Sequence, residues 1–411
     1  MPMAETAISA QPQRLQSYRT VRQFSEQLCA TLSAEDTCIQ SMPDVSPSKW
    51  HLAHTTWFFE QFILAEYCEG YQPFHPQYAY LFNSYYISKG DRHARPARGL
   101  LSRPTLDEIL AYRHAIDERL IQWLEQSDPP DTIDTLITLG LNHEQQHQEL
   151  LLMDIKHVFF CNPLFPAYSK TPMPAAFATG QTGEWLEHPG GLVEIGHHGA
   201  DFSFDNEQPR HKVWLEPFAL ADALVTNGDW LDFIEDGGYH TPRLWLSEGW
   251  DWCQQNDIAA PLYWVYDDEI LEFTLHGLQT LNPDRPVSHI SYYEAAAFAE
   301  WAGARLPSEA EWEVAARPGS HQHLLHPGGD GFFGQLWQWT SSPYQAYPGF
   351  KPLPGSLGEY NGKFMSSQMV LRGSACITPP GHERTTYRNF FYPQQRWQFA
   401  GLRLARDRTT D

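Results

Sequence analysis

The chain has 411 residues, of which 42% are hydrophobic and 19% are charged, and its formal net charge at pH 7 is −22. At ~150 residues per domain, this length predicts two or three domains. Runs of ~18 apolar residues are absent and the N-terminal stretch is polar, so we expect neither a membrane span nor a secretory signal. An acidic chain repels nucleic-acid phosphates and anionic lipid head groups, so we expect neither nucleic acid nor a membrane surface as a partner.

The cysteines are scattered along the chain and lack the C-x-x-C spacing of a zinc ribbon or a thioredoxin-like site. They are Cys29, Cys38, Cys68, Cys161, Cys253 and Cys376. This pattern favours a reducing compartment, so we expect the protein in the cytoplasm. The sequence is also compatible with a homo-oligomer.

Residues 12–165 predict a helical domain, because apolar residues recur there at spacings of three and four. Helices are expected near 15–32, after Ser46-Pro47 with Ser46 as the cap, after Ser102-Arg-Pro-Thr105, and over 132–158. This number of helices is typical of a simple bundle.

Residues 166–183 are rich in proline, glycine and threonine and predict a linker. From 184 to 411 short apolar runs alternate with turn residues, and helical spacing returns only in short stretches such as 292–301 and 308–316. This second domain is expected to be α+β with short strands and long loops.

The clearest local motif is His143-Glu-Gln-Gln-His147, which places two imidazoles on one face of the predicted helix. Leucines before and after the pair make that face apolar. An isolated pair of this kind is at least as often two core histidines bonded to other side chains. A metal ion would also satisfy both, while Glu144 turns off the face.

A third histidine shifts the balance toward a metal. His54 shares a helical stripe with Trp50 and Trp57, whereas His51 is turned away from that stripe and is interpreted as a flanking residue. Together with His143 and His147, His54 makes a set of three imidazoles with open coordination positions. Such a set suits catalytic zinc or non-haem iron, and spacing alone does not choose between them.

The polar loop after the His54 helix holds the next candidates. Arg95 and Arg98 are suited to a carboxylate ligand, although surface ion pairs explain them equally well. Tyr85 and Tyr86 could donate protons to a reacting oxygen species, although adjacent tyrosines are more often packing residues.

These motifs resemble known families. Segments 46–55 and 143–149 resemble the metal-binding bundle of DinB-like domains, and the second half resembles formylglycine-generating enzymes, which have a C-type-lectin-like fold. The segments that carry the second resemblance are 204–211, 223–227, 286–295, 305–312, 337–342, 372–374 and 401–405. Both halves in one chain resemble the sulfoxide synthases of ergothioneine biosynthesis.

This resemblance implies an iron(II) enzyme that uses O2 to join a thiol sulfur to the imidazole of Nα-trimethylhistidine (hercynine), yielding a sulfoxide. It makes His54, His143 and His147 the iron ligands. It also implies substrate contacts from Gln146 to the hercynine imidazole, from Arg95 and Arg98 to the carboxylate of the sulfur donor, and from Asn389 and Phe390 to the trimethylammonium group.

Two departures from the family pattern bear on the sulfur donor and the proton donor. The branch that uses γ-glutamylcysteine has an acid where this chain has Phe391, which favours cysteine as the donor. The same branch has its proton-donating tyrosine in the C-terminal domain, where this chain offers Tyr347 as a weak candidate. Tyr85 and Tyr86 resemble the tyrosine pair of the cysteine-using branch, so the role is assigned to them. Formylglycine generation itself is disfavoured, because it needs a cysteine pair near the C-terminus and only Cys376 is there.

Alternatives to this prediction remain open. The same chemistry could use γ-glutamylcysteine, or unmethylated histidine on the route to ovothiol. The chain could instead be a non-catalytic ligand-binding protein with a structural zinc, or a hydrolase or thiol transferase that uses the metal of the bundle.

Overall fold

The computed structural model describes residues 5–127, 129–171, 184–317 and 332–408. Most of the predicted linker, residues 172–183, lies outside the described residues. The chain divides into two compact units, Met1–Ser169 and Lys170–Asp411. Within the described ranges, no helix combines the length and the apolar character that crossing a membrane requires.

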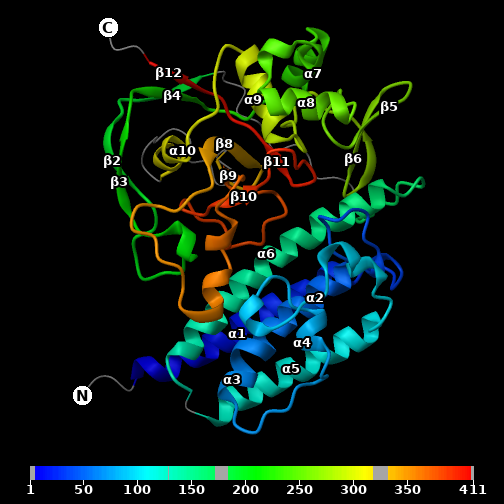
Figure 1. Cartoon of the computed structure of the whole chain (residues 1–411), viewed down its shortest axis with the longest axis vertical. Helices are drawn as coiled ribbons and strands as arrows, with labels where there is room; N and C mark the ends of the chain where they lie inside the picture. Colours follow the sequence, from blue (N-terminus) through cyan, green and yellow to red (C-terminus); the bar gives the residue numbers. More distant parts are fainter. Residues whose placement is uncertain (1–4, 128, 172–183, 318–331, 409–411) are drawn as a thin grey trace. The chain divides into compact units, whose positions relative to one another are not determined.

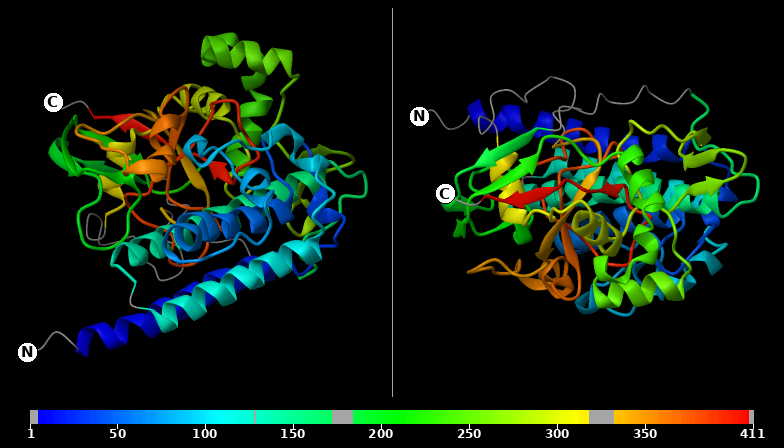
Figure 2. Two further views of the ribbon diagram at one scale, coloured as in Figure 1. Left: turned by 60° about the horizontal axis from the view of Figure 1, so that its bottom comes forward. Right: turned by 90° about the horizontal axis from the view of Figure 1, so that it is seen from above.

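The first unit is a helical bundle. Its long helices are α1 (Glu5–Cys29), α2 (Ser48–Phe59), α5 (Leu106–Gln126) and α6 (Thr132–Phe160), which lie side by side (Figures 1 and 2). A π-helical turn over Glu60–Leu64 and the short helices α3 (Ala65–Tyr67) and α4 (Tyr78–Leu81) follow α2. The predicted bundle is confirmed.

Two helix starts in the bundle are stabilised differently. Thr105 caps α5, and its hydroxyl accepts a hydrogen bond from the backbone N–H of Glu108 at 3.2 Å in a capping box. The prediction that Ser46 caps α2 is wrong, because Pro47 is the cap residue and no side chain caps this helix. The Ser46 hydroxyl accepts a hydrogen bond from Arg98 instead.

The second unit combines short strands with helices. Among the described residues the strands form four sheets, in the orders β1-β4-β12, β10-β9-β8-β11, β2-β3 and β5-β6-β7. The strands are β1 (Trp185–His188), β2 (Gly191–Ile195), β3 (His211–Leu215), β4 (Phe218–Ala221), β5 (Trp264–Tyr266), β6 (Ile270–Thr274), β7 (Gly277–Thr280), β8 (Trp337–Pro343), β9 (Met369–Arg372), β10 (Asn389–Phe391), β11 (Ala400–Gly401) and β12 (Ala405–Asp407). All pairs are antiparallel except β8 with β11.

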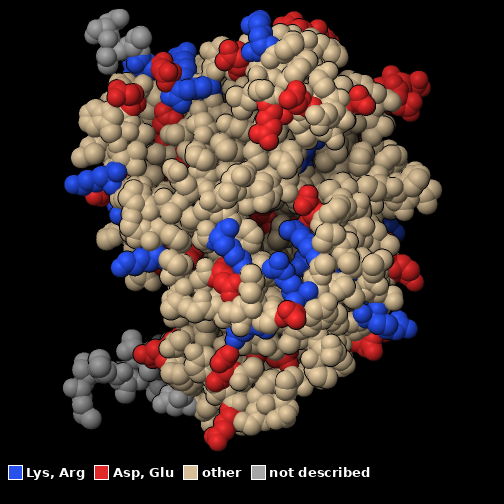
Figure 3. All heavy atoms as spheres, viewed as in Figure 1, with Lys and Arg blue, Asp and Glu red and all other residues tan. Residues whose placement is uncertain are grey.

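The helices of this unit are α7 (Asn227–Glu235), α8 (Ser247–Gln255), α9 (Tyr292–Trp301) and α10 (Glu309–Ala315). Trp312 of α10 is fully buried in a core with Phe218 and Leu220 of β4. This mixture of helices and short strands confirms the predicted α+β fold class. Acidic and basic side chains are scattered over the face of the molecule seen in Figure 3.

Candidate metal centre

His54 lies in the middle of α2, between two indole rings. Its imidazole stacks on Trp50 and Trp57, with ring centroids 4.7 and 5.6 Å away and interplanar angles of 13° and 18°. Its Nδ1 lies 2.6 Å from the carbonyl oxygen of Phe82, so Nδ1 carries the proton and donates it. The lone pair is therefore on Nε2, which is buried and has no hydrogen-bond partner.

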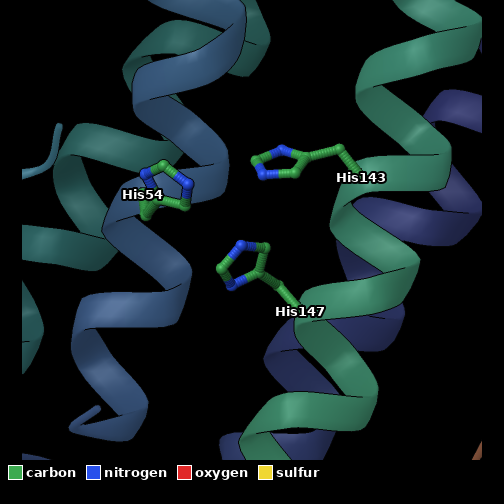
Figure 4. A group of neighbouring side chains, drawn as sticks. All are labelled: His54, His143 and His147. Carbon is green, nitrogen blue, oxygen red and sulfur yellow. The ribbon is translucent and has the colours of Figure 1, made fainter. Parts of the chain in front are cut away.

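His143 and His147 lie one turn apart on α6. Their ring centroids are 5.0 and 4.7 Å from that of His54, and 4.7 Å from each other. One ring nitrogen from each histidine lies within 4.8 Å of the others. Figure 4 shows the three rings turned toward one another between α2 and α6.

All three imidazoles are held in the neutral form. Burial lowers the pKa of His143 to about 3. Burial also lowers the pKa of His54 and of His147 well below the usual range, and the neighbouring histidines add to the effect. At neutral pH each ring therefore keeps a lone pair for a cation.

The arrangement fits a single metal ion. A buried polar atom without a partner costs on the order of 1 to 3 kcal/mol, and a cation between the rings would remove that cost for His54 Nε2. The group contains no carboxylate, and no second group of this kind occurs in the described part of the chain. Three neutral nitrogen ligands leave coordination positions open, which suits catalytic zinc or non-haem iron.

Glu144 fixes α6 against the rest of the bundle. It is fully buried and accepts hydrogen bonds from Arg22 at 2.8 Å, from Ser25 at 2.5 Å and from Arg113. Burial alone raises the pKa of Glu144, but Arg113 and Arg22 outweigh it and lower the pKa to about 2. These bonds join α6 to α1 and α5 and turn Glu144 away from the histidines, as its helical spacing predicts.

Arg98 is a buried cation beside the start of α2. Its Nη1 donates to the Ser46 hydroxyl at 2.9 Å and its Nη2 to the Ser84 hydroxyl at 3.2 Å, while its guanidinium lies 3.4 Å from the ring centroid of Trp50. Burial lowers its pKa well below the usual range. Within the described residues no carboxylate lies at ion-pair distance, so this site is suited to an anionic ligand.

Arg95 and Gln146 occupy different surroundings. Arg95 begins a 3-10 helix over Arg95–Leu100, is exposed, and donates to the backbone carbonyl of Asp44. Gln146 is half-buried on α6, immediately before His147. Gln146 thus belongs to the helix that carries His143 and His147, whereas Arg95 is at the surface.

Tyr86 is buried next to the aromatic stack, and Tyr85 is half-buried beside it. The Tyr86 ring centroid lies 5.5 Å from that of Trp57, so one indole separates it from His54. Asn83, which the sequence did not single out, holds this loop. Its side chain donates to the Tyr86 carbonyl at 2.9 Å and accepts from the Tyr86 N–H at 3.0 Å.

The remaining predicted substrate residues form β10 in the second unit. Phe390 stacks on Tyr344, with ring centroids 3.9 Å apart and an interplanar angle of 10°. The Asn389 side-chain oxygen accepts the Phe390 N–H at 2.9 Å, and Phe391 packs edge-on against Trp397. The strand therefore carries aromatic faces next to an amide.

Tyr347 lies in the second unit, in an environment different from that of Tyr85 and Tyr86. Its hydroxyl donates to Glu309 at 3.1 Å, and the Arg388 guanidinium lies 3.9 Å from its ring centroid. Burial, followed by Glu309, raises its pKa. The phenol of Tyr347 is thus bonded within the core of the second unit.

Two further residues near the histidines were missed as functional candidates. His51 is buried with its Nδ1 2.8 Å from Nδ1 of His147, and its Nε2 lies 3.0 Å from Asp154. A signal for this contact was present in the sequence, because Asp154 follows His147 by seven residues and so lies on the same helical face. An acid in an apolar stripe needs a polar partner.

Fold and site together define a two-unit chain in which a helical bundle holds a centre of three histidines, two of them buried, and an α+β unit follows. Comparison with family models agrees with this division. Residues 17–151 match the DinB superfamily, and residues 171–332 match the sulfatase-modifying factor enzyme 1-like domain.

Known relatives extend over both units. The chain is 30% identical to the hercynine oxygenase of Mycolicibacterium smegmatis, over 90% of this chain and 92% of that protein. It is also 30% identical to the hercynine oxygenase of Mycobacterium tuberculosis, over 90% of this chain and 93% of that protein. The formylglycine-generating enzyme of Streptomyces coelicolor is 34% identical over 38% of this chain and 53% of its own length. The chain belongs to the hercynine oxygenase family.

Proposed function

We propose that this protein is an iron(II)- and O2-dependent enzyme that joins the sulfur of cysteine to the imidazole carbon of hercynine, producing a sulfoxide for ergothioneine biosynthesis. The observation that carries this proposal is the group of His54, His143 and His147, of which the first two are buried and the third is half-buried, in a chain whose relatives over 90% of its length are named hercynine oxygenases. The reaction balances with O2 as the oxidant. A C–H and an S–H bond break, a C–S bond forms, and one oxygen atom ends in the sulfoxide and the other in water.

Iron fits this reaction better than zinc. Zinc does not change its oxidation state, whereas iron(II) supplies the electrons that O2 activation requires. The protein provides the nitrogen ligands, and Trp50, Trp57 and Phe58 pack against the rings and limit their contact with water.

Arg98 is proposed to bind the carboxylate of the thiol substrate. Its guanidinium is buried and already oriented by two hydroxyl groups and an indole face. Arg95 would add a second, exposed cation. In the second unit Phe391 replaces an acid that the γ-glutamylcysteine-using branch carries, and a phenyl ring offers nothing to the polar γ-glutamyl group. We therefore propose cysteine as the sulfur donor.

Hercynine is proposed to contact Gln146 through its imidazole, and Asn389 and Phe390 through its trimethylammonium group. A quaternary ammonium cannot donate a hydrogen bond, so it is recognised by aromatic faces. The stack of Phe390 on Tyr344 supplies such a face.

Tyr85 and Tyr86 are proposed to donate a phenolic proton to the reacting oxygen, which favours C–S bond formation over oxidation of the thiol to a sulfinic acid. Replacing both by Phe should lower the yield of coupled product on the order of 10²-fold and raise the sulfinic acid share. Product ratios measured by mass spectrometry test this role, with Tyr80→Phe as an exposed control. An unchanged ratio in the double variant would contradict it.

The proposed function itself is tested by anaerobic reconstitution with Fe(II), followed by O2 and hercynine with either cysteine or γ-glutamylcysteine. We expect a hercynyl-cysteine sulfoxide from cysteine, and no product from His143→Ala. If the γ-glutamyl adduct dominates, the proposed enzyme class stands, but the proposal of cysteine as the sulfur donor is wrong. The absence of O2 consumption with either thiol would favour a zinc or ligand-binding protein instead.

A further inference from the structure

A chain of buried polar groups leads away from His147 on the α2 side. His51 of α2 is 3% exposed and Asp154 of α6 is 2% exposed. Nδ1 of His147 lies 2.8 Å from Nδ1 of His51, and Nε2 of His51 lies 3.0 Å from Oδ2 of Asp154. Carboxylate, imidazole and imidazole therefore follow one another through the space between the two helices.

The direction of these hydrogen bonds follows from their chemistry. An ionised carboxylate only accepts, so Nε2 of His51 donates to Asp154. A neutral imidazole has one donor and one acceptor, so Nδ1 of His51 accepts the proton of His147 Nδ1. His147 then carries its lone pair on Nε2, as His54 does. The opposite direction would put a proton on His147 Nε2 and remove a ligand.

Asp154 is itself held in place by the start of α2. Its Oδ2 accepts the backbone N–H of Ser46 at 2.8 Å, and the Ser46 hydroxyl accepts from Arg98 at 2.9 Å. The carboxylate therefore has two N–H donors on the same oxygen. This anchor fixes where the His51 ring lies, and through it the orientation of the His147 ring.

We propose that His51 and Asp154 are positioning residues that set the tautomer and the ring orientation of His147 for metal binding. This inference rests on the proposed function only in requiring that the three histidines bind a metal. Partners of this kind behind a ligand histidine contribute about 10- to 100-fold to metal affinity. His51 thus acts through His147 without being a ligand.

The test is anaerobic titration of the full chain with Co(II), reading the visible absorption of the bound ion as well as affinity. His51→Phe keeps a ring but removes the acceptor, and we expect about 10- to 100-fold weaker binding with altered absorption bands. His51→Asn places an oxygen near the position of Nδ1, so it should bind within a few-fold of the wild type. The matched control is His157→Phe, because His157 is a half-buried histidine of the same helix that contacts Ser41.

The outcomes separate the two proposals. Wild-type affinity and spectrum in His51→Phe would overturn the positioning role, and so would equal weakening in His51→Phe and His51→Asn. If the wild-type chain binds Co(II) no better than His143→Ala, the metal site and the positioning role both fall. Circular dichroism verifies folding. If His51→Phe does not fold, Asp154→Asn replaces it, with weaker binding expected because a neutral amide accepts less strongly than a carboxylate; unchanged binding would overturn the role.

Discussion

Arg98 shows at the scale of one residue how surroundings indicate a ligand. A buried guanidinium is normally matched by a carboxylate, yet two hydroxyls and an indole face are what this one contacts. The positive charge is therefore available to a bound anion. Its neighbour in the sequence motif, Arg95, is exposed and lacks this environment.

Arg98→Met should keep the packing of the stem on Trp50 while removing the charge. Because hydrogen bonds to a charged group contribute about 1.5 to 3 kcal/mol, we expect the KM for cysteine to rise by roughly 10- to 100-fold, with a smaller change in kcat. Arg95→Met should raise KM less, because its cation is solvated. Steady-state kinetics over a range of cysteine concentrations distinguish the two. Equal KM values in Arg98→Met and the wild type would contradict the assignment.

The sequence predicted some site residues and not others for a physical reason. Helical spacing tells which side chains share a face, so it grouped His143 with His147 and placed His54 on the stripe of Trp50 and Trp57. It does not tell which neighbour a side chain off that stripe meets. His51 was interpreted as a flanking residue, and only the packing of α2 on α6 brings its ring to His147.

Helix α6 illustrates the scale of a single element. One face carries His143 and His147 toward α2, and Glu144 lies on another face among Arg22, Ser25 and Arg113. The buried ion pairs fix the rotation of the helix about its axis, on which the direction of both imidazoles depends. The sequence predicted the helix but not these partners, because they come from distant segments of the chain.

Glu144→Gln should test this anchor. The substitution keeps the shape but removes the buried negative charge that Arg22 and Arg113 share, and leaves them paired only with Asp117 and Glu26 at the edge of the core. We therefore expect a loss of about 3 to 5 kcal/mol in the free energy of unfolding. Urea denaturation measures it. The control is Glu125→Gln, because Glu125 is exposed and lies 3.9 Å from Arg19, which predicts a change within about 1 kcal/mol. Equal stability of the two variants would contradict the role of Glu144 in fixing α6.

Short elements were predicted where their signals are local. Helix α9 has the bounds that its sequence indicated, and α10 begins after Ser308, whose hydroxyl accepts the N–H of Glu311 at 3.2 Å. The pairing of the strands was not predicted. Strands β8 and β11 pair in parallel although about sixty residues separate them in the chain, and no local pattern encodes such a partner.

At the scale of the whole molecule, the chain is built from two compact units, and the candidate metal ligands belong to one of them. A ligand that binds only the folded state adds RT ln(1 + [L]/Kd) to stability, about 2.7 kcal/mol at a hundredfold excess over Kd. A bound ligand raises the free energy of a local opening only if that opening breaks the binding site. Metal binding should therefore slow hydrogen exchange most strongly at the backbone amides of α2 and α6.

Hydrogen exchange with and without Co(II) under anaerobic conditions measures this effect. We expect exchange to slow on α2 and α6 by up to about a hundredfold at a hundredfold excess of metal, and to slow much less on β8 and β9 of the second unit. His143→Ala should lose the effect on the helices. Equal slowing in both units would mean that they open together, and the metal would then stabilise the chain as one cooperative body rather than the bundle alone.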